Sequence, residues 1–414
     1  MALPRFAPDT LDGLRDAVAG ALADGTRLAV EGRGSKRGLG RPVVADAVLD
    51  LSALSGITYY EPGELVMEAM AGTPLAEIEA ELAAKNQHLA FEPGEVGHLW
   101  GAGGGSIGGV FACNLSGPRR PFAGAARDHL LGVAAVSGRG EAFSAGGRVV
   151  KNVTGYDMGK LLAGSFGTLS VMGRVTFKVL PRAESERTIL LFGLEPGGAI
   201  AALAKAGFGP WDISGAAWLP ADAAARSAVG YVAGAGASVA AIRLEGARGA
   251  VAERCAALRG ALSIAPTEEL HTHNSRKLWA EMRDGRLIAP GQGPLSSLWR
   301  LTLPSADAAS VLSTIAERTG GEFSSDWQGG LAWLAIGGDG MDVAEAAAVL
   351  RAEAAIAGGH AVLWRATDDA RSAISVFGDQ GDAISALVRR IKSNFDPAGI
   401  LNPGRMAPAA DSAS

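Results

Sequence analysis

The chain has 414 residues, more than one compact core usually holds, so we expect two or three domains. Its formal net charge is −5 and it has no long basic run, which argues against a nucleic-acid partner. Its two cysteines, Cys113 and Cys255, form neither a disulfide framework nor a CxxC metal site, which suits a reducing cytoplasm. The N-terminus lacks a basic segment followed by an apolar core, and no run of about 18 apolar residues occurs. We therefore expect a cytoplasmic protein that reaches a membrane only through a partner.

In chain order, the first third predicts short elements broken by glycine-rich loops. Glycine accounts for 58 of 414 residues, roughly 14%, which is about twice the usual share. A strand is expected over 27–30, and it runs directly into the loop Glu31–Gly40. Helices are expected over 10–24 and 73–85, and further strands over 47–51, 57–60 and 65–70.

The densest glycine run follows at 101–117. Gly103–Gly108 matches G-x-G-x-x-G, with Asp128 20 residues beyond, as in a dinucleotide-binding Rossmann fold. The context argues against that fold, because Glu95–Trp100 is not a buried strand and Pro118 leaves room for only about two helical turns. Apolar residues, which favour burial, occur throughout the run, and this argues against a flexible linker.

The remaining chain predicts a domain boundary near Pro181. Before it we expect strands over 131–136, 140–143 and 174–179, and a helix over 155–163 that is followed by the segment Gly164–Met172. After it, strands such as 188–192 and 298–303 alternate with alanine-rich helices near 197–206, 248–262, 306–318 and 342–357, and a last helix covers 380–394. This order predicts an α+β protein whose second domain is an antiparallel sheet backed by helices.

Two glycine loops about 70 residues apart indicate a pyrophosphate held between two backbone surfaces. The first loop offers Gly32, Arg33, Gly34, Ser35 and Lys36. The second offers Gly105, Ser106, Gly108, Gly109, Asn114, Ser116 and Gly117. The alternative for the first loop is a glycine-rich surface turn without a ligand.

These loops, the run Lys151–Asp157, the segment Gly164–Leu169 and the closing segment Phe395–Gly404 together resemble a known family. They are similar to the vanillyl-alcohol oxidase (PCMH-type) FAD-binding superfamily, and most closely to the FAD-binding E subunits of bacterial glycolate oxidases. The resemblance covers roughly 1–180 and 380–406, while the middle of the chain matches only in position.

The resemblance implies a PCMH-type FAD-binding domain of two α+β subdomains over 1–181. It further implies a cap domain of antiparallel sheet and helices over 182–376, a return to the FAD domain over 377–406 and a flexible tail over 407–414. FAD would contact both glycine loops. It would also contact further residues, namely Asn152, Gly155, Tyr156, Asp157, Gly167, Thr168 and Leu169.

The sequence departs from its relatives in two respects. The first loop has no histidine for covalent attachment, so FAD is expected to be non-covalent. The His-x-Gly-Asp-Gly-Asn run and the Glu-His pair of relatives that oxidise 2-hydroxy acids are also absent, so no metal is assigned. His271 and His273 would share one face of a strand, either as a metal element or as surface histidines.

No catalytic residue is assigned from the sequence. Four arginines could clamp a carboxylate, or could simply be solvated or ion-paired: Arg276, Arg300, Arg365 and Arg405.

The resemblance implies an FAD-binding subunit of a complex that oxidises glycolate to glyoxylate. Its expected partners are a homologous catalytic FAD subunit and an iron–sulfur subunit, and it would relay electrons or act as an accessory. Membrane contact at the inner membrane would be peripheral and through these partners. The alternatives are a stand-alone FAD-dependent 2-hydroxy-acid dehydrogenase and a structural subunit whose FAD does not turn over.

Overall fold

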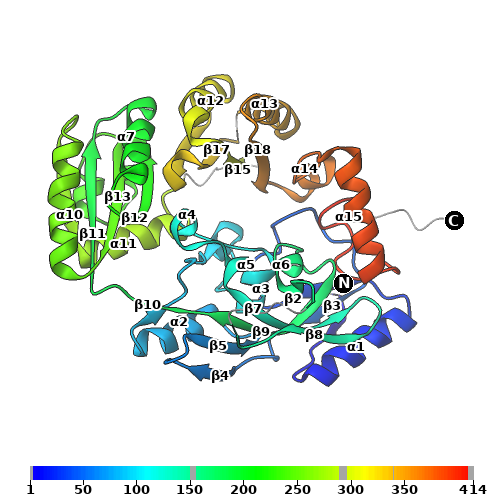
Figure 1. Ribbon diagram of the computed structural model, residues 1–414. Helices are drawn as coiled ribbons and strands as arrows, with labels where there is room; N and C mark the ends of the chain where they lie inside the picture. Colours follow the sequence, from blue (N-terminus) through cyan, green and yellow to red (C-terminus); the bar gives the residue numbers. More distant parts are fainter. Residues whose placement is uncertain (1–2, 150–154, 289–295, 339, 409–414) are drawn as a thin grey trace. The chain divides into compact units, whose positions relative to one another are not determined.

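The computed structural model describes residues 3–149, 155–288, 296–338 and 340–408, which form two compact units (Figure 1). The first unit comprises Met1–Ser116, Gly124–Arg182 and Asp379–Ser414, and the second Gly117–Ala123 and Ala183–Gly378. The short segment Gly117–Ala123, expected within the first domain, thus groups with the second unit. None of the helices in the described ranges is both long and apolar enough to cross a membrane.

The first unit begins with a small parallel sheet in the order β1-β3-β2. Its strands are β1 (Arg5–Phe6), β3 (Ala47–Asp50) and β2 (Leu28–Glu31). Helix α1 (Leu11–Ala23) packs on it through Leu14 and Val18, and its first turn is capped by the Thr10 hydroxyl, which accepts from Gly13 N at 3.0 Å. At the opposite end of the chain, Leu401 forms a parallel bridge with Leu28. The closing segment therefore completes the sheet from which the first glycine loop emerges.

A five-stranded antiparallel sheet forms the other half of the first unit, in the order β4-β5-β9-β7-β8. Its strands are β4 (Ile57–Glu61), β5 (Val66–Met70), β9 (Ser170–Lys178), β7 (Leu130–Ser137) and β8 (Ala142–Gly146). The other elements of the unit are α2 (Leu75–Ala84), β6 (Gln87–His88), η1 (Val96–Trp100), α3 (Ile107–Ala112), α5 (Ala126–His129), α6 (Met158–Leu162), β10 (Leu180–Pro181) and α15 (Gly381–Phe395). Phe111 of α3 lies 5.7 Å from Phe91 and 5.6 Å from Phe177, ring centre to ring centre, and all three rings are fully buried. This aromatic core anchors α3, and with it the second glycine loop.

The second unit is built on an eight-stranded sheet in the order β14-β11-β13-β12-β16-β17-β15-β18, antiparallel throughout. Its strands are β11 (Ser185–Phe192), β12 (Ile213–Leu219), β13 (Val239–Gly246), β14 (Thr267–His271), β15 (Ser297–Thr302), β16 (Glu322–Asp326), β17 (Leu331–Ile336) and β18 (His360–Arg365). Its helices are α4 (Arg120–Ala123), α7 (Pro196–Phe208), α8 (Ala221–Ala225), α9 (Gly230–Ala233), α10 (Arg248–Ala261), α11 (Thr272–Arg283), α12 (Ser305–Thr319), η2 (Trp327–Gly329), α13 (Val343–Ile356) and α14 (Asp368–Ala373).

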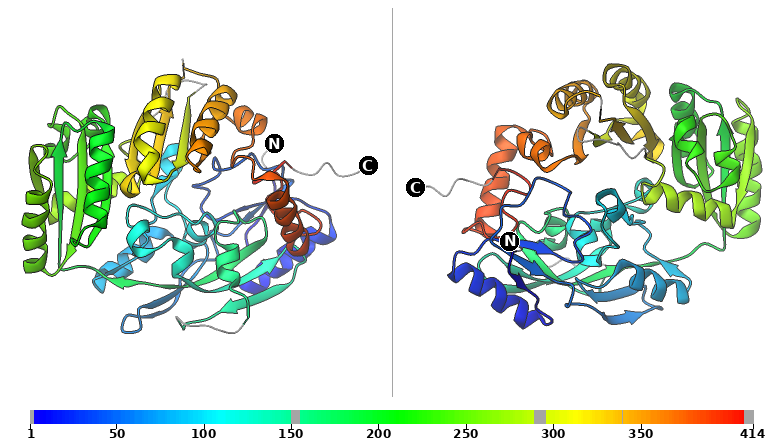
Figure 2. Two further views of the ribbon diagram at one scale, coloured as in Figure 1. Left: turned by 45° about the horizontal axis from the view of Figure 1, so that its top comes forward. Right: turned by 180° about the vertical axis from the view of Figure 1, so that it is seen from behind.

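Helices cover the two halves of this sheet differently. The half formed by β14, β11, β13 and β12 is covered on both faces, by α7 and α10 on one and by α8, α9 and α11 on the other. On the half formed by β16, β17, β15 and β18, one face packs against α12 and α13, which Figure 2 shows side by side in yellow and orange. No apolar cluster joins a described helix to the opposite face of that half.

The α+β class, with an FAD-type domain and an antiparallel sheet backed by helices, is confirmed. Two details differ from the sequence-based expectation. The helix expected over 155–163 is shortened to Met158–Leu162, because the Asp157 carboxylate caps it by accepting from Lys160 N at 3.1 Å. The strand expected over 174–179 begins earlier, because β9 runs from Ser170 to Lys178.

Candidate functional site

The first unit contains an open cleft that encloses about 750 Å³ of empty space, including the solvent at its mouth. Residues from six separate parts of the chain line it, and these parts are separated in sequence by up to several hundred residues. Their lining residues are Val30–Arg37, Leu51, Ala71, Ser106, Gly108, Gly109, Ala112, Cys113, Phe166, Gly167, Ser170, Val171, Met172, Asn402 and Arg405. Both glycine loops therefore face one cleft.

The first loop leaves the end of β2 and lies directly against the second. Gly34 has a φ of +72°, a backbone conformation that a residue with a Cβ rarely adopts. A Cβ built on Gly32 would lie 2.2 Å from the Ser106 hydroxyl oxygen. Glycine in these positions lets the backbone turn tightly and lets the two loops touch.

The second loop enters the short helix α3. Ser106 is the N-cap, and its hydroxyl accepts from Gly109 N at 3.4 Å. Gly108 N donates to the carbonyl of Ala71 at 2.9 Å, and a Cβ on Gly108 would lie 2.8 Å from that same oxygen. The close approach fixes α3 against the end of β5 and directs the loop backbone toward the cleft.

Lys36 supplies a positive charge where the two loops meet. Its Nζ lies 2.9 Å from the Ser35 hydroxyl, and a Cβ on Gly105 would lie only 2.7 Å from Nζ. Lys36 makes no ion pair with any residue in the described ranges. Burial lowers the pKa of Lys36, while the nearby Cys113 and Glu95 act in the opposite direction. A desolvated ammonium group with no acid in direct contact, beside exposed loop backbone, fits an anion such as a pyrophosphate.

Cys113 and Arg405 complete this part of the cleft. Burial raises the pKa of the Cys113 thiol, which keeps the thiol protonated and unreactive as a nucleophile. Arg405 Nη1 donates to the carbonyls of Leu39 at 2.6 Å and Arg37 at 3.1 Å, so it holds the first loop in shape. The sequence predicts for Arg405 either a carboxylate clamp or a solvated or ion-paired side chain, whereas the structure shows it bonded to loop carbonyls.

Asn402 joins three parts of the cleft wall. Its side-chain oxygen accepts from Val30 N at 2.8 Å, and its amide nitrogen donates to the carbonyls of Phe166 at 2.8 Å and Gly167 at 3.4 Å. Neither Asn402 nor Arg405 was among the predicted site residues. The sequence signal for them is the Asn-Pro-Gly closing motif, which the resemblance already places in the FAD domain but without a contact assigned to either residue.

Asp396 and Lys392 fix the closing segment that carries Asn402. The buried Asp396 carboxylate accepts from Ile400 N at 3.0 Å and Leu401 N at 2.9 Å, and it pairs with Lys392. Lys392 Nζ also donates to the carbonyl of Thr168 at 2.6 Å. The last helix and the segment after it are thereby held against the wall of the cleft.

The structure brings about half of the predicted cofactor residues to the cleft. Those that line it are Gly32, Arg33, Gly34, Ser35, Lys36, Ser106, Gly108, Gly109 and Gly167. Predicted residues of the first unit that do not line it are Gly105, Asn114, Ser116, Gly155, Tyr156, Asp157, Thr168 and Leu169. Asn152 lies outside the described residues.

Several of the residues away from the cleft have evident structural roles. The Asn114 side chain accepts from Arg127 N at 3.0 Å, and the Ser116 hydroxyl accepts from Ala126 N at 2.9 Å. The Thr168 hydroxyl donates to the carbonyl of Ser165 at 2.7 Å. Tyr156, by contrast, is 93% exposed.

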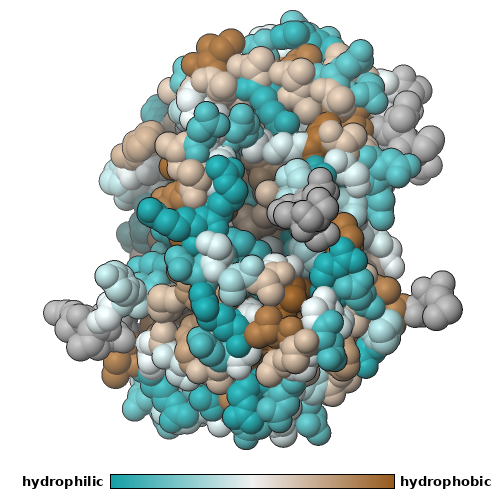
Figure 3. Space-filling view, turned by 90° about the vertical axis from the view of Figure 1, so that its right-hand side faces the viewer, coloured by the Kyte–Doolittle hydropathy of each residue, from teal (hydrophilic) through white to brown (hydrophobic). Residues whose placement is uncertain are grey.

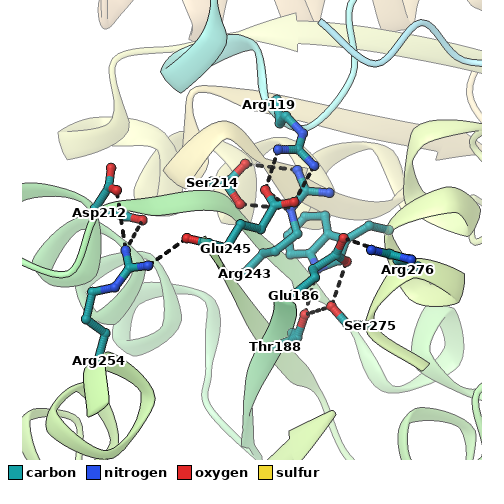
Figure 4. Close-up of polar contacts among 11 residues, drawn as sticks. Arg119, Glu186, Thr188, Asp212, Ser214, Arg243, Glu245, Arg254, Ser275 and Arg276 are labelled. Atoms are coloured by element: carbon teal, nitrogen blue, oxygen red, sulfur yellow. Dashed lines mark hydrogen bonds and ion pairs between the residues drawn. The ribbon is translucent and has the colours of Figure 1, made fainter. Parts of the chain in front are cut away.

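Gly117 belongs to the second unit, where its carbonyl accepts from Trp327 Nε1 at 3.0 Å. The neighbouring Arg119 pairs with Glu245, within a largely buried polar network (Figure 4). In that network Arg243 stacks on Trp279 at 4.5 Å. This network attaches the segment Gly117–Ala123 to the second unit. Gly117 is the first residue of that segment, so it lies in the second unit as well.

Glu186 is the other carboxylate at the centre of Figure 4. It accepts from the Ser275 hydroxyl at 2.8 Å and lies 3.7 Å from Arg276. Burial raises the pKa of Glu186, and the charge of Arg243 opposes that rise. Of the four arginines considered for a carboxylate clamp, Arg276 is thus already paired with an acid.

The expectation that His271 and His273 share a strand face is wrong. His271 ends β14, whereas His273 lies in the first turn of α11. Within the described ranges no group of three histidine, cysteine, aspartate or glutamate side chains could hold a metal ion.

Comparison with known proteins agrees with this geometry. The family described as FAD binding domain matches residues 4–146. Glycolate oxidase subunit GlcE of Escherichia coli is 34% identical over 401 residues, covering 96% of this chain and 97% of the relative. Glycolate oxidase subunit GlcD of Bacillus subtilis is 35% identical over 85 residues, or 20% of this chain and 18% of the relative.

Among solved structures, 4-ethylphenol oxidase from Gulosibacter chungangensis shares the fold, with a TM-score of 0.73 at 16% identity. The match covers 98% of this chain and 89% of the oxidase. The FAD-type domain, the cleft between its glycine loops and the nearly full-length match lead to one conclusion. The chain belongs to the family of FAD-linked oxidoreductases that includes glycolate oxidase subunit GlcE.

Proposed function

We propose that this chain is the FAD-holding E subunit of a complex that oxidises glycolate to glyoxylate. The observation that carries the proposal is the cleft formed by two glycine loops, in a chain that matches a glycolate oxidase subunit over 96% of its length. FAD, when bound, supplies an acceptor for the two electrons of alcohol oxidation. The chain's own residues bind and orient it: the loop backbones and Lys36 face the pyrophosphate, and Asn402 links the end of β2 to the segment Phe166–Gly167.

We propose that FAD is held without a covalent bond. None of the cleft-lining residues within the described ranges is a histidine, and the only cysteine among them, Cys113, has a raised pKa. Acid precipitation should therefore release all flavin into the supernatant. Flavin that stays with the pellet would contradict this part of the proposal.

We further propose that the chain relays electrons or acts as an accessory to a homologous catalytic FAD subunit. The sequence lacks the metal-binding run of relatives that oxidise 2-hydroxy acids directly. The partners would be a GlcD-like subunit and an iron–sulfur subunit in the cytoplasm, with any inner-membrane contact through them. This assignment draws on the name of the matched relative, which is a subunit.

Helix α15 offers a surface for such a partner subunit. Ile384, Leu387 and Val388 share one helical face and are 48%, 43% and 47% exposed. Figure 3 views the side of the protein where α15 lies in Figure 1, and apolar side chains in brown are exposed there among polar ones. Arg389 and Arg390 follow directly and are also exposed. We propose that this face binds another subunit of the complex, through an apolar surface with an acidic rim.

A second candidate function is stand-alone oxidation of a small hydroxy acid. It is favoured by Arg300 of β15, whose guanidinium lies among three tryptophan rings. The two candidates are separated by expressing the chain alone, recording its flavin absorbance and adding glycolate without oxygen. The proposal predicts bound flavin that stays oxidised until the partner subunits are added. Bleaching of flavin in the isolated chain would establish the second candidate instead. A chain that never holds flavin would overturn both.

A further inference from the structure

The half of the second unit's sheet formed by β16, β17, β15 and β18 carries an unusual cluster of side chains on the face opposite to α12 and α13. Arg300 of β15 lies directly opposite Trp333 of β17 and Val362 of β18. Residues directly opposite in neighbouring antiparallel strands point to the same face of a sheet. The alternate residues of these strands, Trp299 among them, enter the core against α12 and α13. Arg300 thus points away from the core of its own unit.

Three tryptophan rings surround the Arg300 guanidinium. Its central carbon lies 5.1 Å from the ring centre of Trp327, 5.8 Å from that of Trp333 and 5.4 Å from that of Trp364. Trp333 and Trp364 contact each other edge to face at 5.2 Å. The aromatic walls hold the guanidinium in place and exclude water, but they provide no hydrogen-bond acceptor in the guanidinium plane.

The charge of Arg300 is not matched by an acid in direct contact. Arg300 makes no hydrogen bond or ion pair with any residue that the structure describes, and its Nε is buried. A second cation, Arg120, lies over the same Trp327 ring at 4.5 Å. The nearest carboxylate that acts on Arg300 is that of Asp326, and it already accepts from Trp327 N at 2.7 Å.

Desolvation does not remove this charge. Burial and the neighbouring Arg120 lower the pKa of Arg300 to about 10, so the guanidinium is still protonated at neutral pH. A protonated, partly desolvated guanidinium whose donors lack acceptors binds a planar anion strongly, because the two N–H groups of its edge match the two oxygens of a carboxylate.

The backbone beside the cluster is strained in a way that fixes one of its walls. Trp327 and Gln328 both have positive φ, +53° and +60°, a conformation that costs free energy for residues with a Cβ. Trp327 is held there by its Nε1 bond to Gly117 and its backbone bond to Asp326. Strain of this kind is typical of positions whose geometry serves a ligand.

We propose that this cluster, Arg300 with Trp327, Trp333 and Trp364, is a binding site for the carboxylate of a small hydroxy acid or oxo acid. Arg300 binds the carboxylate through two parallel hydrogen bonds, and the surrounding indole rings restrict the site to small, planar ligands. The inference rests on the proposed function for the identity of the acid, but not for the existence of the site.

The test uses the purified chain with its flavin and follows tryptophan fluorescence during titration with oxalate and, separately, glycolate. Three of the eight tryptophans surround Arg300, so filling the site should change the emission. The wild type should saturate. Arg300→Met, which fits between the indoles without charge, should weaken binding at least tenfold, and Arg300→Lys should lie between the two. The matched control is Arg318→Met, which removes a half-exposed arginine of α12 paired with Glu353.

The outcomes separate this inference from the proposed function. Wild-type affinity in Arg300→Met with an unchanged melting temperature would overturn the site, as would the absence of saturation in the wild type. Phosphate binding as tightly as oxalate would overturn the carboxylate assignment. Flavin content and glycolate-dependent bleaching, measured on the same samples, report the proposed function independently. A chain that binds oxalate through Arg300 but takes no part in glycolate oxidation would retain the site and lose that function.

Discussion

The side-chain oxygen of Asn402 accepts a hydrogen bond from the backbone N–H of Val30, 372 positions earlier in the chain, at 2.8 Å. The same side chain donates to the carbonyls of Phe166 and Gly167. We expect Asn402→Ala to lower the free energy of unfolding by about 1–3 kcal/mol, because a buried donor loses its acceptor. Denaturant unfolding and flavin content of the purified protein measure the effect.

Asn402→Asp separates the two functions of this side chain. Aspartate can still accept from Val30 N, but it cannot donate to Phe166 and Gly167. It should retain the fold and bind FAD more weakly. Asn394→Ala is the matched control, since the Asn394 side chain is exposed and donates to the Arg390 carbonyl within its own helix. Equal losses in Asn402→Ala and Asn394→Ala would refute a special role for Asn402.

Lys36 makes FAD affinity dependent on pH. An anion stabilises the charged form, so the pKa of Lys36 is higher in the complex than in the free protein, where burial holds it below its usual 10.5. Affinity is therefore full below the free-protein pKa and decreases as pH rises through it. Lys36→Met should weaken FAD binding about ten- to hundredfold, because a hydrogen bond to a charged group contributes about 1.5–3 kcal/mol.

Flavin fluorescence titrations across the pH range in which the protein stays folded provide the measurement. Lys36→Met should abolish the decrease of affinity with rising pH. The control is Lys85→Met, at the exposed end of α2. If Lys36→Met binds FAD as the wild type does, or keeps its pH dependence, Lys36 does not contact an anion.

Two glycines should respond oppositely to the same substitution. Gly108→Ala places a Cβ 2.8 Å from the Ala71 carbonyl oxygen, so α3 must shift and FAD binding should be lost. Gly20→Ala in α1 meets nothing within 4 Å and should stabilise the protein by about 0.5–1 kcal/mol, because alanine favours a helix. Melting temperature and flavin content should move down together in the first variant. Unchanged flavin content in Gly108→Ala would show that the close approach is dispensable.

The α15 surface predicts a separation between folding and assembly. Leu387→Glu places a charge on a side chain that is 43% exposed, so the isolated chain should keep its melting temperature and its flavin. Co-purification with the partner subunits should be lost. Phe208→Glu, on a side chain 88% exposed at the end of α7, is the control and should leave assembly intact. Normal assembly of Leu387→Glu would place the subunit contact elsewhere.

Local chemistry in the sequence predicted the glycine loops, because tight turns and close backbone approach require glycine wherever they occur. It also predicted most helices, as at Leu11–Ala23, from a capping threonine and an apolar period. It could not predict that Asn402 and Arg405 line the cleft, since their partners lie hundreds of residues away. The misplacement of His271 and His273 has the same origin: a helix starts between them, and only the packing of α11 against β11 determines where.

The parallel bridge between Leu28 and Leu401 also has a consequence for biosynthesis. Val30 of β2, from which the first loop emerges, is synthesised 372 positions before Asn402, which lies in the opposite wall of the cleft. The nascent chain can therefore form the first loop well before it can form the wall that contains Asn402 and Arg405. We expect a chain truncated before residue 402 to retain flavin more poorly than the full chain.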